Sequence, residues 1–260
     1  MTHMTIRRID WIMALILAGV ANSAASEAPF SGTWKLNLAK SQFSGQTLTV
    51  EKTASGKLHF DSEGIGYDFD LTGKEYPTPD GGTTSWKAVD AATWEATNRM
   101  NGKVVASYRM SLKGNTIASV MRLTKPDGSV AEQTATVTRV SGGPGFMGKW
   151  KSVDVKGAAT GLELVTDSSN HITLKYPEFQ QVCNGSFDGK DYVLTTAGAA
   201  SKQTLAFERT GANSFRITTK LSGKPLYIDV VSVSADGKVL TDEGNSVSVN
   251  EPVKAVYERQ

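Results

Sequence analysis

The stretch Phe30–Lys35 (FSGTWK) returns 116 positions later as Phe146–Lys151 (FMGKWK), with phenylalanine, glycine, tryptophan and lysine at the same places. A repeat period of this length is too long for a solenoid and matches the size of a small domain. The sequence therefore predicts two copies of one small domain, each beginning close to its own FxGxWK motif.

A second match supports the duplication, because Gly73–Tyr76 (GKEY) aligns with Gly189–Tyr192 (GKDY) at the same offset. Between the copies, residues 142–145 (GGPG) contain three glycines and a proline, which cannot continue a sheet. We therefore expect one domain at 26–141, a linker at 142–145 and a second domain at 146–260.

The first 25 residues have the pattern of a secretory signal peptide. Two arginines precede an apolar run of ten residues, Trp11–Val20, and the small residues Ala21–Ala25 follow. A run of ten is too short to cross a bilayer as a helix, and no stop-transfer pattern follows. We expect a bacterial signal peptide at 1–25, export to the periplasm or the cell exterior, and no integral membrane segment after cleavage.

Charge and cysteine content exclude two classes of protein. Removal of the signal peptide takes away two arginines and one aspartate, which lowers the formal net charge from +2 to +1. A near-neutral surface offers no electrostatic footprint for nucleic acid, so nucleic acid is not an expected partner. Cys183 is the only cysteine, so each domain must be held by an apolar core rather than by disulfides. Whether Cys183 lies in the core or forms an interchain disulfide stays open, as does the oligomeric state.

The local pattern after the leader is that of β-strands. Apolar residues alternate with polar ones in stretches such as Tyr67–Leu71 and Ala106–Leu112, a period of two that buries one face of a strand. Turn signals such as Asn101-Gly102 and Asp127-Gly128 separate these stretches. We predict an all-β protein with two small antiparallel barrels, each of roughly eight to ten strands, with a sandwich as the alternative.

The two ends of each copy resemble the lipocalins and related calycin barrels. In that family a Gly-x-Trp on the first strand meets an arginine on the last strand, which packs across the tryptophan ring where the barrel closes. Here the spacing of 105 residues pairs Trp34 with Arg139, and the spacing of 109 pairs Trp150 with Arg259. The resemblance implies a structural role for all four residues, with a cation–π contact of about 0.5–2 kcal/mol.

The start of the first copy also resembles a group of short secreted bacterial proteins that begin GTWKLN…KS. Gly32–Asn37 and Lys40-Ser41 carry this resemblance. The second copy departs from it, since Ser152–Asp154 replaces the corresponding segment. This resemblance implies export but no particular activity.

Patterns for metal binding and covalent catalysis are scarce. Only His59 and His171 follow the leader, and strand alternation points both toward solvent. Asp68–Gly73 imitates the start of a calcium loop, but Pro79 stands where a bidentate glutamate is needed. No nucleophile elbow is present, and Cys183 has no basic neighbour in sequence. We expect no metal site and no cofactor.

Three arginines share one predicted outer face: Arg99, Arg109 and Arg122. Such a face is most simply solvated, and a contact with the other barrel or with an anionic partner is the alternative.

The differences between the copies point to a candidate site in the second copy. Strand alternation carried over from the first copy places three polar residues at interior positions: Tyr227, Asp229 and Asp242. A carboxylate inside a barrel costs several kcal/mol unless it is paired or faces a wet cavity, so such positions often mark a site. Together with Tyr192 they are the predicted ligand-binding residues. The opposite alternation, with Leu226, Ile228 and Val230 on the core face, would turn Asp229 outward.

Three classes of function remain open at this point. A barrel favours an exported binding protein for a small apolar or amphipathic molecule. Interior carboxylates would suit an isomerase or hydratase that works in the barrel cavity. A lumen filled by aromatic residues would suit a structural or interaction module of the envelope, and fold alone cannot choose among the three.

Overall fold

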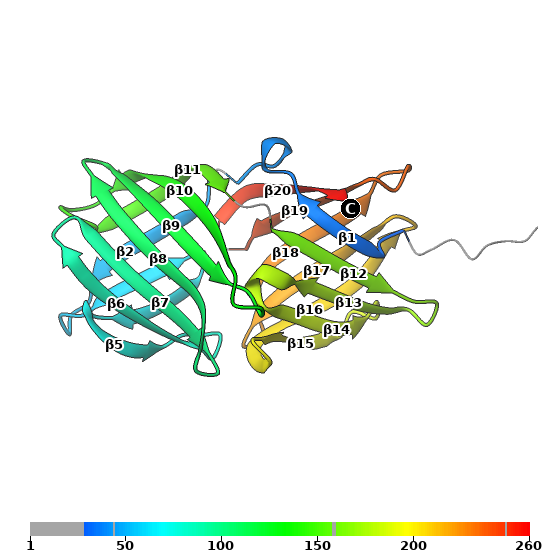
Figure 1. Ribbon diagram of the computed structural model, residues 1–260, viewed down its shortest axis with the longest axis horizontal. Coiled ribbons are helices and arrows are strands. Elements are labelled where there is room, and N and C mark those ends of the chain that lie inside the picture. Colours follow the sequence, from blue (N-terminus) through cyan, green and yellow to red (C-terminus); the bar gives the residue numbers. More distant parts are fainter. Residues whose placement is uncertain (1–28, 44, 158–159, 248) are drawn as a thin grey trace, which may run out of the picture.

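A computed structural model describes residues 29–43, 45–157, 160–247 and 249–260, so the predicted leader at 1–25 lies outside the described residues. The described residues form two barrels that follow one another along the long axis of the molecule (Figure 1). Each barrel has ten antiparallel strands, which confirms the predicted fold class. Among the described residues, no helix has the length and apolar character needed to span a bilayer.

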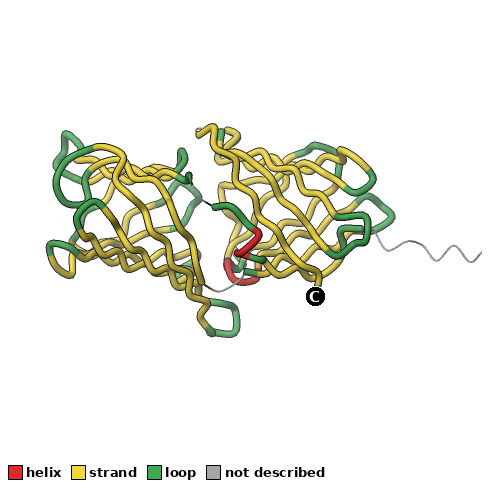
Figure 2. The backbone as a smooth tube through the Cα atoms, turned by 90° about the horizontal axis from the view of Figure 1, so that it is seen from above, coloured by secondary structure: helices red, strands yellow, loops and turns green. Residues whose placement is uncertain are grey.

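The first barrel is the sheet of β2 (Thr47–Lys52), β3 (Leu58–Ser62), β4 (Ile65–Phe69), β5 (Thr72–Pro77), β6 (Thr83–Asp90), β7 (Thr93–Met100), β8 (Lys103–Lys113), β9 (Thr116–Thr124), β10 (Val130–Ser141) and β11 (Gly148–Gly157). The second barrel is the closed sheet of β1 (Gly32–Leu36), β12 (Gly161–Thr166), β13 (His171–Tyr176), β14 (Gln181–Ser186), β15 (Asp191–Thr196), β16 (Ala199–Gly211), β17 (Ser214–Leu221), β18 (Lys224–Val233), β19 (Val239–Ser246) and β20 (Val249–Arg259). Two short 3-10 turns, η1 (Leu38–Lys40) and η2 (Pro177–Phe179), lie near the junction of the barrels (Figure 2).

The two strands that carry the FxGxWK motif are exchanged between the barrels. β1 pairs with β12 and β20, whereas β11 pairs with β2 and β10. β11 therefore holds the same place in the first barrel that β1 holds in the second. The first barrel is one continuous segment, 47–157, inserted between β1 and β12 of the second barrel.

This exchange corrects the predicted domain ranges. The ranges 26–141 and 146–260 each give one strand to the sheet of the other. Residues 142–145, predicted to link the two domains, instead connect β10 to β11 as neighbours within the first barrel. The chain crosses between barrels elsewhere, from the end of β1 to β2 and from the end of β11 to β12.

The motif tryptophans have arginine partners, but the predicted pairs are wrong. The Cζ of Arg259 lies 4.2 Å from the ring centroid of Trp34, and that of Arg139 lies 4.1 Å from the ring centroid of Trp150. Both indole rings are fully buried, and each indole N–H donates to the carbonyl oxygen of its own motif phenylalanine at 3.0 Å. The spacing within each copy suggested the opposite pairs, and the strand exchange reverses them.

The lumen of the first barrel is filled by aromatic side chains. Trp94 stacks on Phe146 with ring centroids 4.1 Å apart, and Trp86 packs against Phe69 at 4.8 Å. All four side chains are buried, together with Trp150. The barrel is nearly closed, because β4 and β5 stand at the two ends of the sheet order and form no ladder with each other.

The barrels meet through their ends. Phe179 of η2 packs against an apolar cluster of the first barrel that contains Ala106 and Leu123. The side-chain amide of Gln180 donates to the carbonyl oxygen of Thr124 at 2.6 Å. The first barrel thereby covers the end of the second barrel at which β13 finishes and β14 begins.

Candidate functional site

The structure places Asp229 and Asp242 inside the second barrel. On β18, Ile228 and Val230 are 44% and 40% exposed on the outer face, so the alternation of the strand turns Asp229 inward. Asp242 on β19 pairs with Val231, whose side chain is buried. The prediction that Asp229 and Asp242 point into the barrel is therefore confirmed. The alternative, in which Ile228 and Val230 point into the core, is wrong.

Gly244 makes the interior position of Asp229 possible. These two residues are direct cross-strand partners, and a Cβ atom on Gly244 would overlap Oδ1 of Asp229. In the first barrel the corresponding partners are Tyr108 and Met121. Replacing a tyrosine and a methionine with an aspartate and a glycine removes apolar volume, and it puts a carboxylate where the first barrel has a ring.

Burial raises the pKa of both carboxyl groups. Desolvation raises the pKa of Asp229 to about 6. Desolvation, and then the negative charge of Asp229, raise the pKa of Asp242 to about 8. The same burial, followed by these two charges, raises the pKa of Tyr257 and Tyr176 above the ordinary tyrosine value. Burial therefore favours the protonated form of both carboxyl groups, and an ionised Asp229 disfavours the ionisation of Asp242.

A cavity of about 170 Å³ lies beside Asp229. One part of its wall is apolar and consists of Leu194, Leu205 and Ile217. The rest is polar or aromatic and consists of Tyr176, Gln181, Gln203, Thr219 and Asp229. None of these wall residues is cationic, and no described residue donates a hydrogen bond to the buried Oδ1 of Asp242. The site therefore has acceptor capacity and negative charge that the chain itself does not satisfy.

The two predicted ligand tyrosines lie outside the cavity wall. The hydroxyl of Tyr227 donates to Oε2 of Glu63 at 3.3 Å, so this side chain joins the second barrel to the β3–β4 turn of the first. Tyr192 donates to Oδ1 of Asp188 at 3.0 Å, and its ring packs on Phe207. Tyr227 thus stands at the junction, and Tyr192 supports the core away from the site.

Sequence reasoning found Asp229 but none of the other cavity-wall residues, and it also missed Tyr257, which interacts with Asp242, and Glu63, which bonds to Tyr227. Tyr257 could have been recognised from the sequence. It lies two residues before Arg259 and therefore on the same face of the strand, and it is a tyrosine where the first copy has Val137 before Arg139. Glu63 carried no such signal, because it lies in a turn of the other barrel. Glu63 is only 8% exposed, and desolvation raises the pKa of its carboxyl group despite the hydrogen bond from Tyr227.

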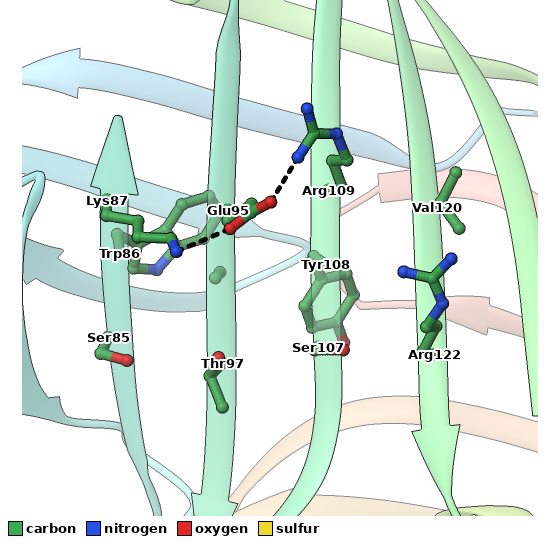
Figure 3. Close-up of a pocket in the computed structure, with 11 residues that line it drawn as sticks. Ser85, Trp86, Lys87, Glu95, Thr97, Ser107, Tyr108, Arg109, Val120 and Arg122 are labelled. Carbon is green, nitrogen blue, oxygen red and sulfur yellow. Dashed lines mark hydrogen bonds and ion pairs between the residues drawn. The ribbon is translucent and has the colours of Figure 1, made fainter. Parts of the chain in front are cut away.

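A second hollow, of about 400 Å³, lies on the outer face of β6 to β9 in the first barrel (Figure 3). Glu95 stands between Lys87 and Arg109 there and accepts from both. Each of the three predicted outward arginines has a carboxylate partner: Arg99 with Glu75, Arg109 with Glu95 and Arg122 with Glu132. The charged side chains of this hollow, Lys87, Glu95, Arg109 and Arg122, form ion pairs, whereas the carboxylates of the inner cavity have none among the described residues.

The other sequence candidates have structural explanations. His59 and His171 are exposed beside aspartates, as predicted. Cys183 is fully buried in the core of the second barrel, and burial raises the pKa of its thiol to about 12. Asp70 accepts hydrogen bonds from Thr72 and Tyr76 next to the β4–β5 turn. Within the described part of the chain, no three His, Cys, Asp or Glu side chains are grouped to hold a metal ion.

No protein-family model matches the chain, and no curated protein matches it. The site is therefore interpreted from its own chemistry.

Proposed function

We propose that the protein is an exported binding protein whose second barrel holds a small amphipathic molecule. The observation that carries this proposal is the inner cavity, which sets three apolar side chains opposite a carboxylate without a cationic partner. Small β-barrels have room for one such ligand, and ligand pockets combine apolar walls with a few placed polar groups. Export rests on the leader pattern at 1–25.

The first barrel has a different part in this proposal. Its lumen is filled by aromatic rings, so it supports the assembly and covers the mouth of the second barrel. We infer that both are lipocalin-type barrels that arose as two copies of one domain. The tryptophan–arginine contact at the closure of each barrel supports this inference.

Native mass spectrometry of the full-length protein tests the binding function. We expect a small-molecule mass that is present in non-denaturing solution and lost in denaturing solvent. Ile217→Trp, which fills the cavity from its wall, should lose this mass, whereas Ile228→Trp on the outer face should keep it. Identical masses of the wild-type protein in both solvents would contradict the proposal.

A second candidate function is acid–base catalysis by the carboxylate pair. Two neighbouring carboxyl groups whose pKa values are separated and raised toward neutrality are the arrangement of a general acid beside a general base. The test is uptake of deuterium from D₂O into carbon positions of the co-purified molecule. Uptake that disappears in Asp229→Asn supports an isomerase or hydratase, and no uptake by the wild-type protein leaves binding as the function.

A further inference from the structure

The inner cavity of the second barrel is unbalanced in charge. Asp229 and Asp242 have no ion-pair partner among the described residues, and Oδ1 of Asp242 is shielded from solvent without a hydrogen bond. The titratable groups that interact with the pair or with its tyrosine neighbours are phenols and carboxyls: Tyr176 on β13, Glu178 in η2, Tyr227 on β18, Tyr257 on β20, and Asp61 and Glu63 at the end of the first barrel. Lys125 lies at this end beside Glu178, with 3.8 Å between Nζ and Oε1.

A ligand that completes this site must therefore bring positive charge and N–H donors. A buried carboxylate without a partner costs several kcal/mol, and a cation placed against it offsets that cost. The ring of Tyr176 in the cavity wall adds a face to which a cation is attracted. An anionic head group would instead meet like charge from the pair and from Glu63 at the mouth.

The size of the cavity limits the rest of the ligand. An apolar cavity of about 150 Å³ holds a benzene molecule, so about 170 Å³ accepts a body of roughly six to eight non-hydrogen atoms. Leu194, Leu205 and Ile217 provide the apolar contact for such a body.

Resting on the binding function proposed above, we propose that the second barrel selects a small organic ammonium ion, with Asp229 as its counter-ion and the apolar wall around its hydrocarbon body. An ammonium group next to the pair favours the ionised carboxylates, so binding releases a proton from a carboxyl group that is still protonated. Affinity should therefore rise with pH from about 5 to 8, as long as the amine itself stays protonated.

Isothermal titration of the full chain with three benzene derivatives tests the charge selectivity. Benzylamine is the cation, benzyl alcohol is its neutral isostere, and benzoate, which has one more non-hydrogen atom, is the anion. At pH 7.5 we expect benzylamine to bind at least about tenfold more tightly than benzyl alcohol, and benzoate to give no heat. Equal binding of amine and alcohol, or preference for benzoate, would overturn the ammonium proposal while leaving the binding function intact. No heat with any probe would overturn both.

A variant pair assigns the selectivity to the carboxylate. Asp229→Asn should reduce the amine-to-alcohol preference at least about tenfold while the alcohol still binds. Glu243→Gln, on the outer face of β19 and paired with Lys254, should leave both affinities unchanged. An unchanged preference in Asp229→Asn would overturn the role of Asp229. If Asp229→Asn does not fold, the ratio of benzylamine to benzyl alcohol affinity is measured for the wild-type protein between pH 5 and 8. A ratio that does not change over this range would overturn the proposal.

Discussion

Asp242 is the residue that most clearly conflicts with the rules of a protein interior. Its Oδ1 is buried without a hydrogen bond, although buried polar atoms are nearly always paired. The corresponding residue of the first barrel, Ser119, carries no charge. Buried groups of this kind often belong to functional sites. The free-energy cost of burying the charge of Asp242 is expressed as its raised pKa.

The contribution of Asp229 and Asp242 to the stability of the protein should fall as pH rises from about 4 to 8. The folded-state pKa values of Asp229 and Asp242 lie above the ordinary value of 3.8, so the folded state binds more protons than the unfolded state in this window. Asp242→Asn removes one of these protonation sites. It should therefore gain about 1–3 kcal/mol of unfolding free energy over wild type at pH 8, and little at pH 4.

Urea unfolding followed by circular dichroism across this pH range measures the effect. Glu243→Gln on the same strand is the matched control and should change the free energy by less than about 0.5 kcal/mol, because exposed ion pairs contribute little. A difference between wild type and Asp242→Asn that stays constant from pH 5 to 8 would mean that Asp242 is not desolvated.

Gly244→Ala tests the space that holds the Asp229 side chain. The added Cβ would overlap Oδ1 of Asp229, so either the strands or the carboxylate must shift, at a cost of about 1–3 kcal/mol. Gly143→Ala is the control, because a Cβ there meets its nearest neighbour at 3.9 Å and at an ordinary backbone angle. Equal unfolding midpoints for the two variants would contradict the packing of Asp229 against β19.

Among the strands, β1 and β11 decide how the barrels close. Each places its tryptophan beside an arginine of its neighbour, and each arginine also donates to backbone carbonyls near the motif, Arg259 to Ser31 and Arg139 to Met147, both at 2.6 Å. Gly32 has a φ of +153°, and a Cβ there would lie 2.6 Å from an amino nitrogen of Arg259. The glycine of the motif therefore makes room for the guanidinium that covers the ring.

Double-mutant cycles should detect the strand exchange in solution. Trp34→Leu and Arg259→Gln are expected to couple by about 0.5–2 kcal/mol, because the cation–π contact joins them. Trp34→Leu and Arg139→Gln lie in different barrels and should add within about 0.5 kcal/mol. Unfolding free energies of the single and double variants give both values. The reverse pattern would show that each copy closes on its own first strand.

The whole molecule is a nested arrangement rather than two successive domains. The first barrel occupies 47–157 without interruption, whereas the second needs β1 from before it and β12 to β20 from after it. The junction contains one apolar and one polar contact. Phe179 packs on apolar residues at the end of the first barrel, while Glu63 meets Tyr227 at the end of the second. The filled barrel thus covers the end of the barrel that has the polar cavity.

Fragments should fold according to this nesting. A chain of residues 47–157 contains all ten strands of the first barrel, so we expect a cooperative thermal transition and dispersed amide resonances. A chain of 29–141 has the same ten-strand count but carries β1 in place of β11, and we expect it to melt at least about 10 °C lower or to aggregate. Equal melting temperatures would mean that β1 can replace β11.

Short-range rules were enough for the strands, the barrel closure motif and the interior carboxylates. Alternation of side chains along a strand depends only on neighbouring residues, so Asp229 and Asp242 could be placed inside from the sequence. Tyr192 packs against the core of the second barrel but lies outside the cavity wall, because alternation predicts a face and not the depth along the barrel. Glu63 was missed because its contact with Tyr227 joins residues 164 positions apart in different barrels.

The sequence by itself indicated two barrels of roughly eight to ten strands, each with a tryptophan that meets an arginine, but only the tertiary structure decided which strand closes which barrel. Trp34 and Trp150 lie in the same motif, and Arg139 and Arg259 end equivalent strands, so pairwise rules favour neither assignment. With the barrels end to end, β10 of 12 residues is about 40 Å long and finishes at the end away from the junction. The connection through residues 142–147 spans at most about 25 Å, which is shorter than β10. β11 therefore has to run back beside β10 in the first barrel, and β1 takes the equivalent position beside β20 in the second barrel.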